Sequence, residues 1–105
     1  MTAAIRKALP ALYSGESIPL EEKVAVAKFF DPTGRYTFFA TEGSPEGDDF
    51  LMFGYVISPL GSDCDEWGNV SLNELASVRG RMGLGIERDL HFSPTKMGEI
   101  LARAT

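Results

Sequence analysis

Residues 23–41 read KVAVAKFFDPTGRYTFFAT, two runs of strand-forming residues on either side of a turn. The first run, residues 23–30, is rich in Val, Ala and Phe. The second, residues 35–41, alternates side chains between two faces, as a strand does. The four residues 31–34 between them place a proline where a type I turn prefers one. This pattern predicts an antiparallel hairpin, and the rest of the sheet is built outward from it.

Three further strands are predicted along the chain. Residues 50–57 are almost wholly apolar, which indicates a central strand that is buried on both faces. Gly54 within this strand indicates a bulge or a close approach of another backbone. Residues 67–72 are predicted to form a short strand. Residues 86–92 alternate in the manner of a half-buried or edge strand.

Helices are predicted at both ends of the chain and in its middle. A short N-terminal helix should end near Leu9, because a proline follows. Residues 71–74 fit a capping box, so a helix over residues 72–78 should follow it. Ser93 is expected to cap the last helix, with Pro94 at its first position. Helices and antiparallel strands in this order predict the α+β class.

The predicted architecture is an antiparallel meander sheet of four to five strands packed against the N-terminal, middle and C-terminal helices. A chain of 105 residues suffices for a single domain, residues 1–105, with one core. Cys64 is the only cysteine, which rules out an intrachain disulfide and favours a reducing, cytoplasmic setting. We expect neither a signal peptide nor a transmembrane helix, because there is no long apolar run. The net charge of −5 argues against broad binding to a phosphate backbone.

The densest set of chemically active residues is the segment 77–92, which contains three glycines, three arginines and the only histidine. Arg79 and Arg81 on a glycine-rich loop could hold a phosphate or carboxylate with paired hydrogen bonds. A helix C-terminus followed by a glycine turn explains the same residues without a ligand, since cations suit that end of the helix dipole. On the predicted strand, His91 shares a face with Glu87 and Asp89.

A carboxylate beside an imidazole is the arrangement of a general base, so His91 with Asp89 or Glu87 could serve a small hydrolase. An exposed polar strand face with local ion pairs is the simpler explanation. Two acidic segments, residues 42–49 and 63–66, are expected to be exposed loops that could contact a basic groove. The candidate binding residues are Arg79, Arg81, Glu87, Arg88, Asp89, His91, Asp48, Asp49, Asp63 and Asp65.

Residues 63–74 also match much of a twelve-residue calcium loop, with Gly68 at position 6 and Glu74 at position 12. However, Trp67 stands where an oxygen ligand belongs, and no helix is predicted before the loop. Glu74 already has a role in the capping box. Coincidence is therefore the favoured explanation, and we expect neither a metal nor a cofactor.

Aromatic residues are concentrated on the three strands predicted between residues 23 and 57. If a helix leaves one face of the sheet uncovered, the rings on that face form a platform for nucleic-acid bases or for a partner protein. Burial of both faces is the favoured alternative. The rings concerned are Phe29, Phe30, Tyr36, Phe38, Phe39, Phe50, Phe53 and Tyr55.

Six segments in order carry a family resemblance: IPLEEK (18–23), FFDP (29–32), ATE (40–42), FGYV (53–56), SLNELASVRG (71–80) and LGIERDLHF (84–92). With these segments the chain resembles the bacterial domain-of-unknown-function family 2958, which is carried largely on conjugative plasmids, integrative elements and phages. The resemblance implies a small cytoplasmic accessory protein near DNA transfer or anti-defence functions, and it implies no activity. The acidity of residues 62–66 departs from the pattern.

The function predicted from these observations is that of a small non-enzymatic accessory or binding protein that acts through contacts with another protein. A nuclease or host-defence complex is the suggested partner. Binding of single-stranded nucleic acid through the sheet aromatics and the arginine loop is the first alternative. A small hydrolase that uses His91 is the second.

Overall fold

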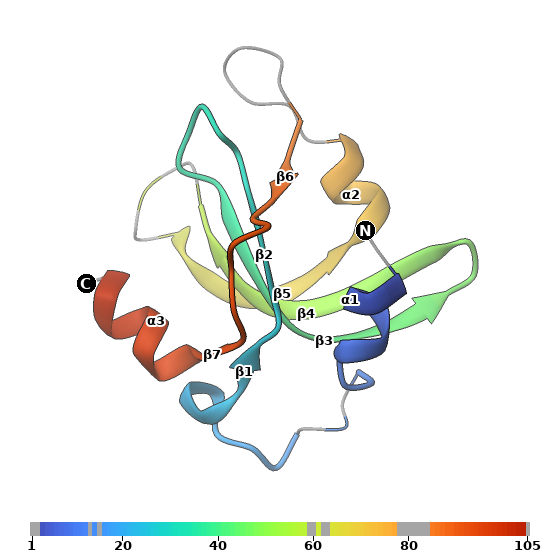
Figure 1. The fold of residues 1–105 in the computed structure, drawn as a ribbon, viewed down its shortest axis with the longest axis horizontal. Helices are drawn as coiled ribbons and strands as arrows, with labels where there is room; N and C mark the ends of the chain where they lie inside the picture. The colour runs from blue at the N-terminus through green and yellow to red at the C-terminus, as the bar shows by residue number, and fades with distance from the viewer. Residues whose placement is uncertain are drawn as a thin grey trace.

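The structure, a computed structural model, describes residues 3–12, 14, 16–58, 61, 64–77 and 85–104. A five-stranded antiparallel sheet in the order β5-β4-β3-β2-β6 forms its centre, and a two-stranded sheet pairs β1 with β7 (Figure 1). The strands are β1 (Val24–Ala25), β2 (Ala27–Phe30), β3 (Thr37–Glu46), β4 (Asp49–Ile57), β5 (Glu66–Ser71), β6 (Glu87–Arg88) and β7 (Thr95–Lys96). The helices are α1 (Ala3–Ala8), the 3-10 helix η1 (Leu20–Glu22), α2 (Leu72–Ser77) and α3 (Met97–Ala104). The predicted α+β class is therefore confirmed.

The predicted hairpin is present as β2 and β3, with Phe30 opposite Thr37. The turn is held by the Asp31 carboxylate, whose Oδ1 accepts hydrogen bonds from the Thr33 backbone N–H at 2.8 Å and hydroxyl at 2.7 Å. The first predicted strand is interrupted at Val26. Its beginning, β1, pairs with β7, and its remainder, β2, pairs with β3 and β6.

The expectation of an exposed acidic loop over residues 42–49 is wrong. Strand β3 continues to Glu46 and pairs with β4 throughout, so that only Gly47 and Asp48 remain as a two-residue turn. Gly47 has φ +58°, which the absence of a side chain permits. Pro45 is tolerated because β2 pairs only as far as Ala40, which leaves this part of β3 at an edge where no strand needs the missing N–H.

Each face of the large sheet carries a buried cluster, and the two adjacent rings of Phe38 and Phe39 point to opposite sides. Phe38 packs in a cluster with Leu9 beside α1 and Leu75 on α2. Phe39 packs in a second cluster with Met97 and other residues of α3. The favoured alternative for the aromatics, burial of both faces, is thus confirmed for the inner rings.

Two predictions near the C-terminus are wrong. The strand predicted over residues 86–92 ends at Arg88, because the Asp89 Oδ1 accepts a hydrogen bond from the His91 N–H at 2.9 Å and forms a turn. The last helix begins at Met97 rather than at Pro94, since the residues between them form β7 and pair with β1. The Met97 N–H donates to the Lys23 carbonyl at 2.8 Å, which ties the start of α3 to the residue before β1.

The capping box before α2 is confirmed in both directions. The Glu74 N–H donates to the Ser71 hydroxyl at 3.0 Å, and the Ser71 N–H donates to the Glu74 carboxylate at 3.3 Å. No helix within the described ranges is long and apolar enough to cross a membrane.

Candidate binding groove around Lys23 and Glu42

A buried ion pair joins Lys23, the residue between η1 and β1, to Glu42 on β3. The Lys23 Nζ lies 2.5 Å from the Glu42 Oε2, and the two residues are only 7% and 5% exposed. The ammonium group also lies 5.8 Å from the centroid of the Phe53 ring. Charged residues are almost never buried to this degree unless they are paired, as these two are.

A β-bulge places Glu42 in this position. The register between β3 and β4 shifts between Ala40 and Glu42, so that Glu42 faces Phe53 while Phe39 faces Tyr55. Because Phe53 and Tyr55 lie two residues apart on one strand, Glu42 shares their face of the sheet. Without the extra residue, the carboxylate would point to the opposite face, into the core beneath α1 and α2.

Two cavities adjoin the ion pair. The first, about 380 Å³, is lined by Glu16, Ile18, Pro19, Leu20, Lys23, Glu42 and Phe53. The second, about 430 Å³, also contacts Ile18, Lys23 and Glu42 and reaches Val24, Val26 and Pro94. Each volume falls within the range of small ligand sites. We call the combined depression the Lys23 groove.

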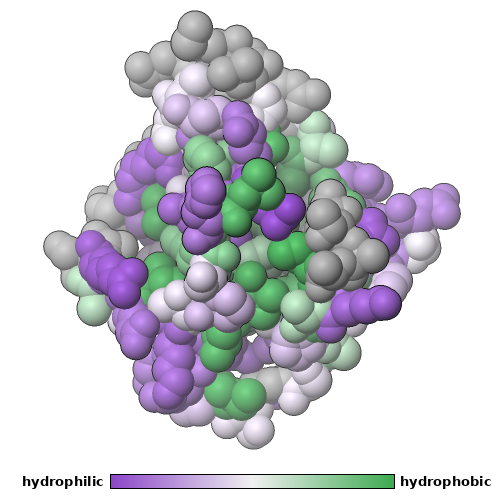
Figure 2. Space-filling view, in the orientation of Figure 1, coloured by the Kyte–Doolittle hydropathy of each residue, from purple (hydrophilic) through white to green (hydrophobic). Residues whose placement is uncertain are grey.

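The rim of the Lys23 groove exposes large apolar side chains. Ile18 is 45% exposed, and Leu20 and Val24 are each 41% exposed. Figure 2 shows hydrophobic side chains at the surface over β1, between polar ones. Glu16 and Glu22 line the cavities as well, and Glu22 forms an exposed ion pair with Lys96, so the rim combines apolar and charged side chains. Contiguous apolar surface with a polar border is typical of interaction sites.

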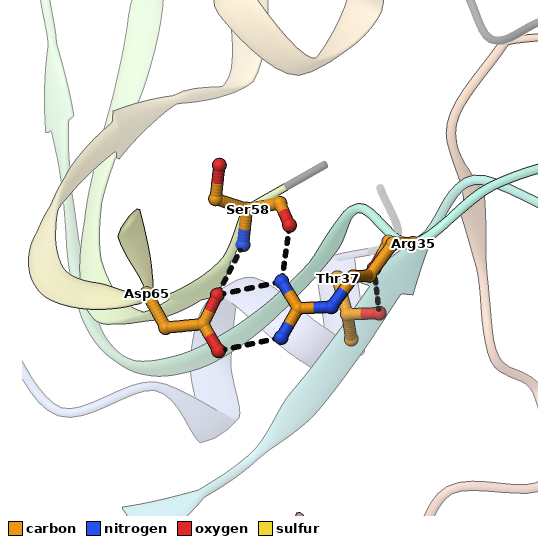
Figure 3. A network of polar contacts seen from close by, with 4 residues as sticks. All are labelled: Arg35, Thr37, Ser58 and Asp65. Atoms are coloured by element: carbon orange, nitrogen blue, oxygen red, sulfur yellow. Dashed lines mark hydrogen bonds and ion pairs between the residues drawn. The ribbon is translucent and has the colours of Figure 1, made fainter. Parts of the chain in front are cut away.

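Asp65 is held within the chain by Arg35. The guanidinium donates two hydrogen bonds of 2.8 Å to the two carboxylate oxygens, and it also donates to the Ser58 carbonyl (Figure 3). The Ser58 N–H donates to the Asp65 Oδ1 at 2.8 Å. Hydrogen bonding from Arg35 therefore lowers the pKa of Asp65, although desolvation opposes the shift. A contact between Asp65 and a partner stays a prediction, but this carboxylate already has a cationic partner within the chain.

The Arg35–Asp65 contact predicts a dependence of stability on pH. Since the folded-state pKa of Asp65 is lowered, its contribution is complete above the unfolded value of about 3.9 and is lost as the pH falls through the folded value. Urea unfolding midpoints should therefore decline from pH 6 to pH 2.5, and the decline should be shallower in D65N. A D65N slope equal to that of the native protein would contradict this assignment.

Asp48 and Asp49 lie at the β3–β4 turn. Asp48 is exposed, whereas Asp49 is half-buried and its Oδ1 accepts from the N–H groups of Phe50 at 2.7 Å and Asn73 at 3.0 Å. Desolvation raises the pKa of Asp49, but these backbone hydrogen bonds outweigh it and the net shift is downward. Asp49 thus helps to hold the start of α2 against the hairpin.

The remaining predicted residues do not gather in one site. Glu87 and Arg88 form β6, and Asp89 and His91 lie in the turn after it, with the Asp89 Oδ2 3.8 Å from the Lys28 Nζ. This region, the β3–β4 turn and the start of β5 lie on three different sides of the molecule (Figure 1). Arg79, Arg81 and Asp63 lie outside the described residues.

The calcium loop is also divided by the fold. Trp67 lies within β5, and Ser71 and Glu74 bond each other in the capping box. Asp63 is outside the described residues. Among the residues that are described, no three His, Cys, Asp or Glu side chains gather closely enough to hold a metal ion.

Residues 2–104 match a protein family described as protein of unknown function (DUF2958). The chain belongs to this family. This membership confirms the resemblance that six separate segments indicated. No curated protein and no solved structure matches the chain. The DUF2958 family carries no stated activity, so any function has to follow from the residues themselves.

Sequence reasoning missed the Lys23 groove. Lys23 and Glu42 are 19 residues apart: Lys23 begins one predicted strand, Glu42 follows another, and neither belongs to a recognisable motif. The useful signal was weak: both residues fall inside segments that carry the family resemblance, Lys23 in IPLEEK and Glu42 in ATE. The two side chains meet because of the bulge at Thr41, and no local sequence pattern predicted this bulge.

Proposed function

We propose that this DUF2958 protein is a non-enzymatic binding protein that acts through protein–protein contacts made by the Lys23 groove. The observation that carries the proposal is the ring of exposed apolar side chains around two adjoining cavities. Lys23 and Glu42 neutralise each other at the floor of the groove. An apolar side chain of a partner can therefore enter the groove without removing water from an isolated charge.

The partner should carry basic residues beside its apolar anchor. Glu16 lines the first cavity, and the chain as a whole has a net charge of −5. Glu46 and Asp48 add exposed carboxylates at the β3–β4 turn. Complementary charge of this kind raises the association rate and makes it sensitive to salt.

We extend the proposal to the setting implied by the family resemblance, a cytoplasmic accessory protein of a mobile genetic element. This part rests on the resemblance alone. A nuclease or a host-defence complex would suit the groove, because a surface that binds nucleic acid is rich in the basic residues that the acidic rim would attract.

A random peptide library displayed on phage tests the proposal. Selected peptides should combine an apolar or aromatic anchor with neighbouring Lys or Arg. The variant I18D should weaken their binding by about tenfold or more, since a carboxylate replaces a contact residue and faces the apolar anchor. L90D is the matched control: Leu90 is 72% exposed, does not line the groove, and its replacement should leave binding unchanged.

Both variants should fold normally, because the replaced side chains are exposed. Selection of acidic peptides, or equal losses in I18D and L90D, would contradict the proposed groove. Unchanged binding of the selected peptides to I18D would also contradict the proposed groove.

Single-stranded nucleic-acid binding remains the second candidate because one group of rings is half-exposed. Phe53 stacks on Trp67 with centroids 5.7 Å apart and planes 19° apart, and Tyr55 meets Trp67 edge-on at 5.5 Å. Bases can stack on such rings. Fluorescence anisotropy that shows binding of labelled single strands tighter than about 10 μM at physiological salt would favour this candidate over the groove. The hydrolase hypothesis loses its geometric premise, because His91 and Asp89 lie in a turn and not on one strand face.

A further inference from the structure

Another pocket, separate from both cavities of the Lys23 groove, lies between α3 and the sheet. It has a volume of about 300 Å³ and is lined by Lys28, Phe39, Ile57, Phe92, Ile100 and Arg103. Four of these six side chains are apolar, and the two polar ones are both cations. In a chain with a net charge of −5, an apolar pocket with two cations on its wall is a distinct chemical environment.

The floor of this pocket is aromatic and firmly held. The rings of Phe39 and Phe92 have centroids 5.9 Å apart at 50°, and Phe39 and Ile100 are buried in the cluster beneath α3. The two rings come from β3 and from the turn before β7, so the floor joins the sheet to the C-terminal segment. An apolar ligand can therefore contact side chains that packing has already fixed in place.

Lys28 reaches the same pocket from β2. Its Nζ lies 5.9 Å from the ring centroids of both Phe30 and Phe39, and its side chain is 33% exposed. The Asp89 Oδ2 lies 3.8 Å from this nitrogen, farther than in a normal charge-assisted hydrogen bond. Arg103, on the last turn of α3, supplies a second and exposed positive charge. The Lys28 ammonium group is thus positioned by the rings of Phe30 and Phe39 and by the more distant Asp89 carboxylate.

We propose that this pocket binds a small amphipathic anion, a carboxylate or phosphate attached to an apolar group about the size of one aromatic ring. The apolar group would lie on Phe39 and Phe92, and the anionic group would lie between Lys28 and Arg103. The pocket volume is at the lower end for ligand sites, so a ligand of this size suits it. None of the residues that line this pocket lines the Lys23 groove.

Titration of the 15N-labelled protein with benzoate and with phenyl phosphate, followed by NMR, tests the site and distinguishes carboxylate from phosphate. Saturable shifts at Phe39, Phe92 and Ile100 are expected, with a Kd on the order of 1 mM or tighter for a ligand this small. Benzyl alcohol and benzylamine, of similar size, should bind at least about tenfold more weakly, because they lack the negative charge. Equal binding of the neutral and anionic probes would overturn the proposal.

Three substitutions refine the test. K28M and R103Q should each weaken benzoate binding severalfold, while K7Q, which removes a positive charge from the exposed face of α1, should leave it unchanged. D89N should strengthen binding, since it removes the carboxylate that competes for Lys28 but keeps an oxygen to accept from the His91 N–H. R103Q alters an exposed residue and remains informative if K28M is unstable. Shifts that map outside the pocket, or equal losses in K7Q and R103Q, would refute the assignment.

Discussion

Replacing Lys23 with methionine is expected to lower the free energy of unfolding by about 3–5 kcal/mol, because it leaves the Glu42 carboxylate buried without its lysine. This loss is a large fraction of the roughly 5–15 kcal/mol that stabilises a typical domain. The melting temperature of a domain this size should fall by about 4–8 °C for each kcal/mol. Thermal and urea unfolding of K23M measure the change directly.

K96M is the matched control for K23M. Lys96 also pairs with a glutamate, Glu22, at 3.1 Å, but both side chains are more than half exposed. Removal of that pair should change stability by only about 0–1 kcal/mol, since solvent already screens it. Similar losses in K23M and K96M would show that water reaches the Lys23 pair and that burial does not set its strength.

The double variant K23M/E42M should recover most of the stability that K23M loses, because two apolar side chains of similar volume fill the same space without a buried charge. The double variant also separates stability from recognition. If it is as stable as the native chain but no longer binds basic peptides, the ion pair serves binding. If it binds them equally well, the groove recognises only the apolar anchor and the rim carboxylates.

Gly54 is the second position at which a small change should have a large effect. A methyl group on Gly54 would lie 1.8 Å from the Phe39 carbonyl oxygen and 2.8 Å from the carbonyl carbon. These are backbone atoms of the neighbouring strand, so no rotation of a side chain can relieve the overlap. G54A should therefore lose about 3 kcal/mol or more as β3 and β4 move apart in the middle of the sheet.

Gly68 provides a control on the adjacent strand. It lies directly opposite Gly54 in the ladder between β4 and β5, but a methyl group on Gly68 would have no atom of the described residues within 4 Å beyond its own chain neighbours. G68A should stay within about 0.5 kcal/mol of the native protein or stabilise it slightly, because alanine restricts the unfolded chain more than glycine does. Urea unfolding measures the stability of both variants, and their midpoints can be compared directly if the m-values are equal. Equal stability of G54A and G68A would show that the strands at Gly54 can separate freely.

Much of the fold follows from short segments of sequence. The turn at Asp31, the strand predicted over residues 50–57 and the capping box at Ser71 each depend on residues close to one another in the chain. Each is present, the strand as β4. The close approach predicted at Gly54 is also confirmed. Local backbone preferences and side-chain periodicity are properties of neighbouring residues, so a sequence can reveal them without knowledge of what packs above.

What neighbouring residues could not reveal was which contacts distant segments would make. Residues 42–46 have the composition of a loop, yet they form a strand because β4 offers a complete ladder of hydrogen bonds. The alternation after Ile86 indicated a longer strand, but the Asp89 side chain turns the chain and β2 pairs with only two of its residues.

The charged residues show most clearly the difference between what local sequence predicts and what contacts between distant segments decide. The sequence by itself indicated that Lys23 would begin a strand, that Glu42 would follow one, and that Asp65 would lie before another. Only the tertiary structure decided that a bulge would turn Glu42 towards Lys23, and that Arg35 would reach Asp65 from 30 residues away. The reason is physical: the face to which a side chain points depends on the register of the strand pair, and a shift of one residue reverses it.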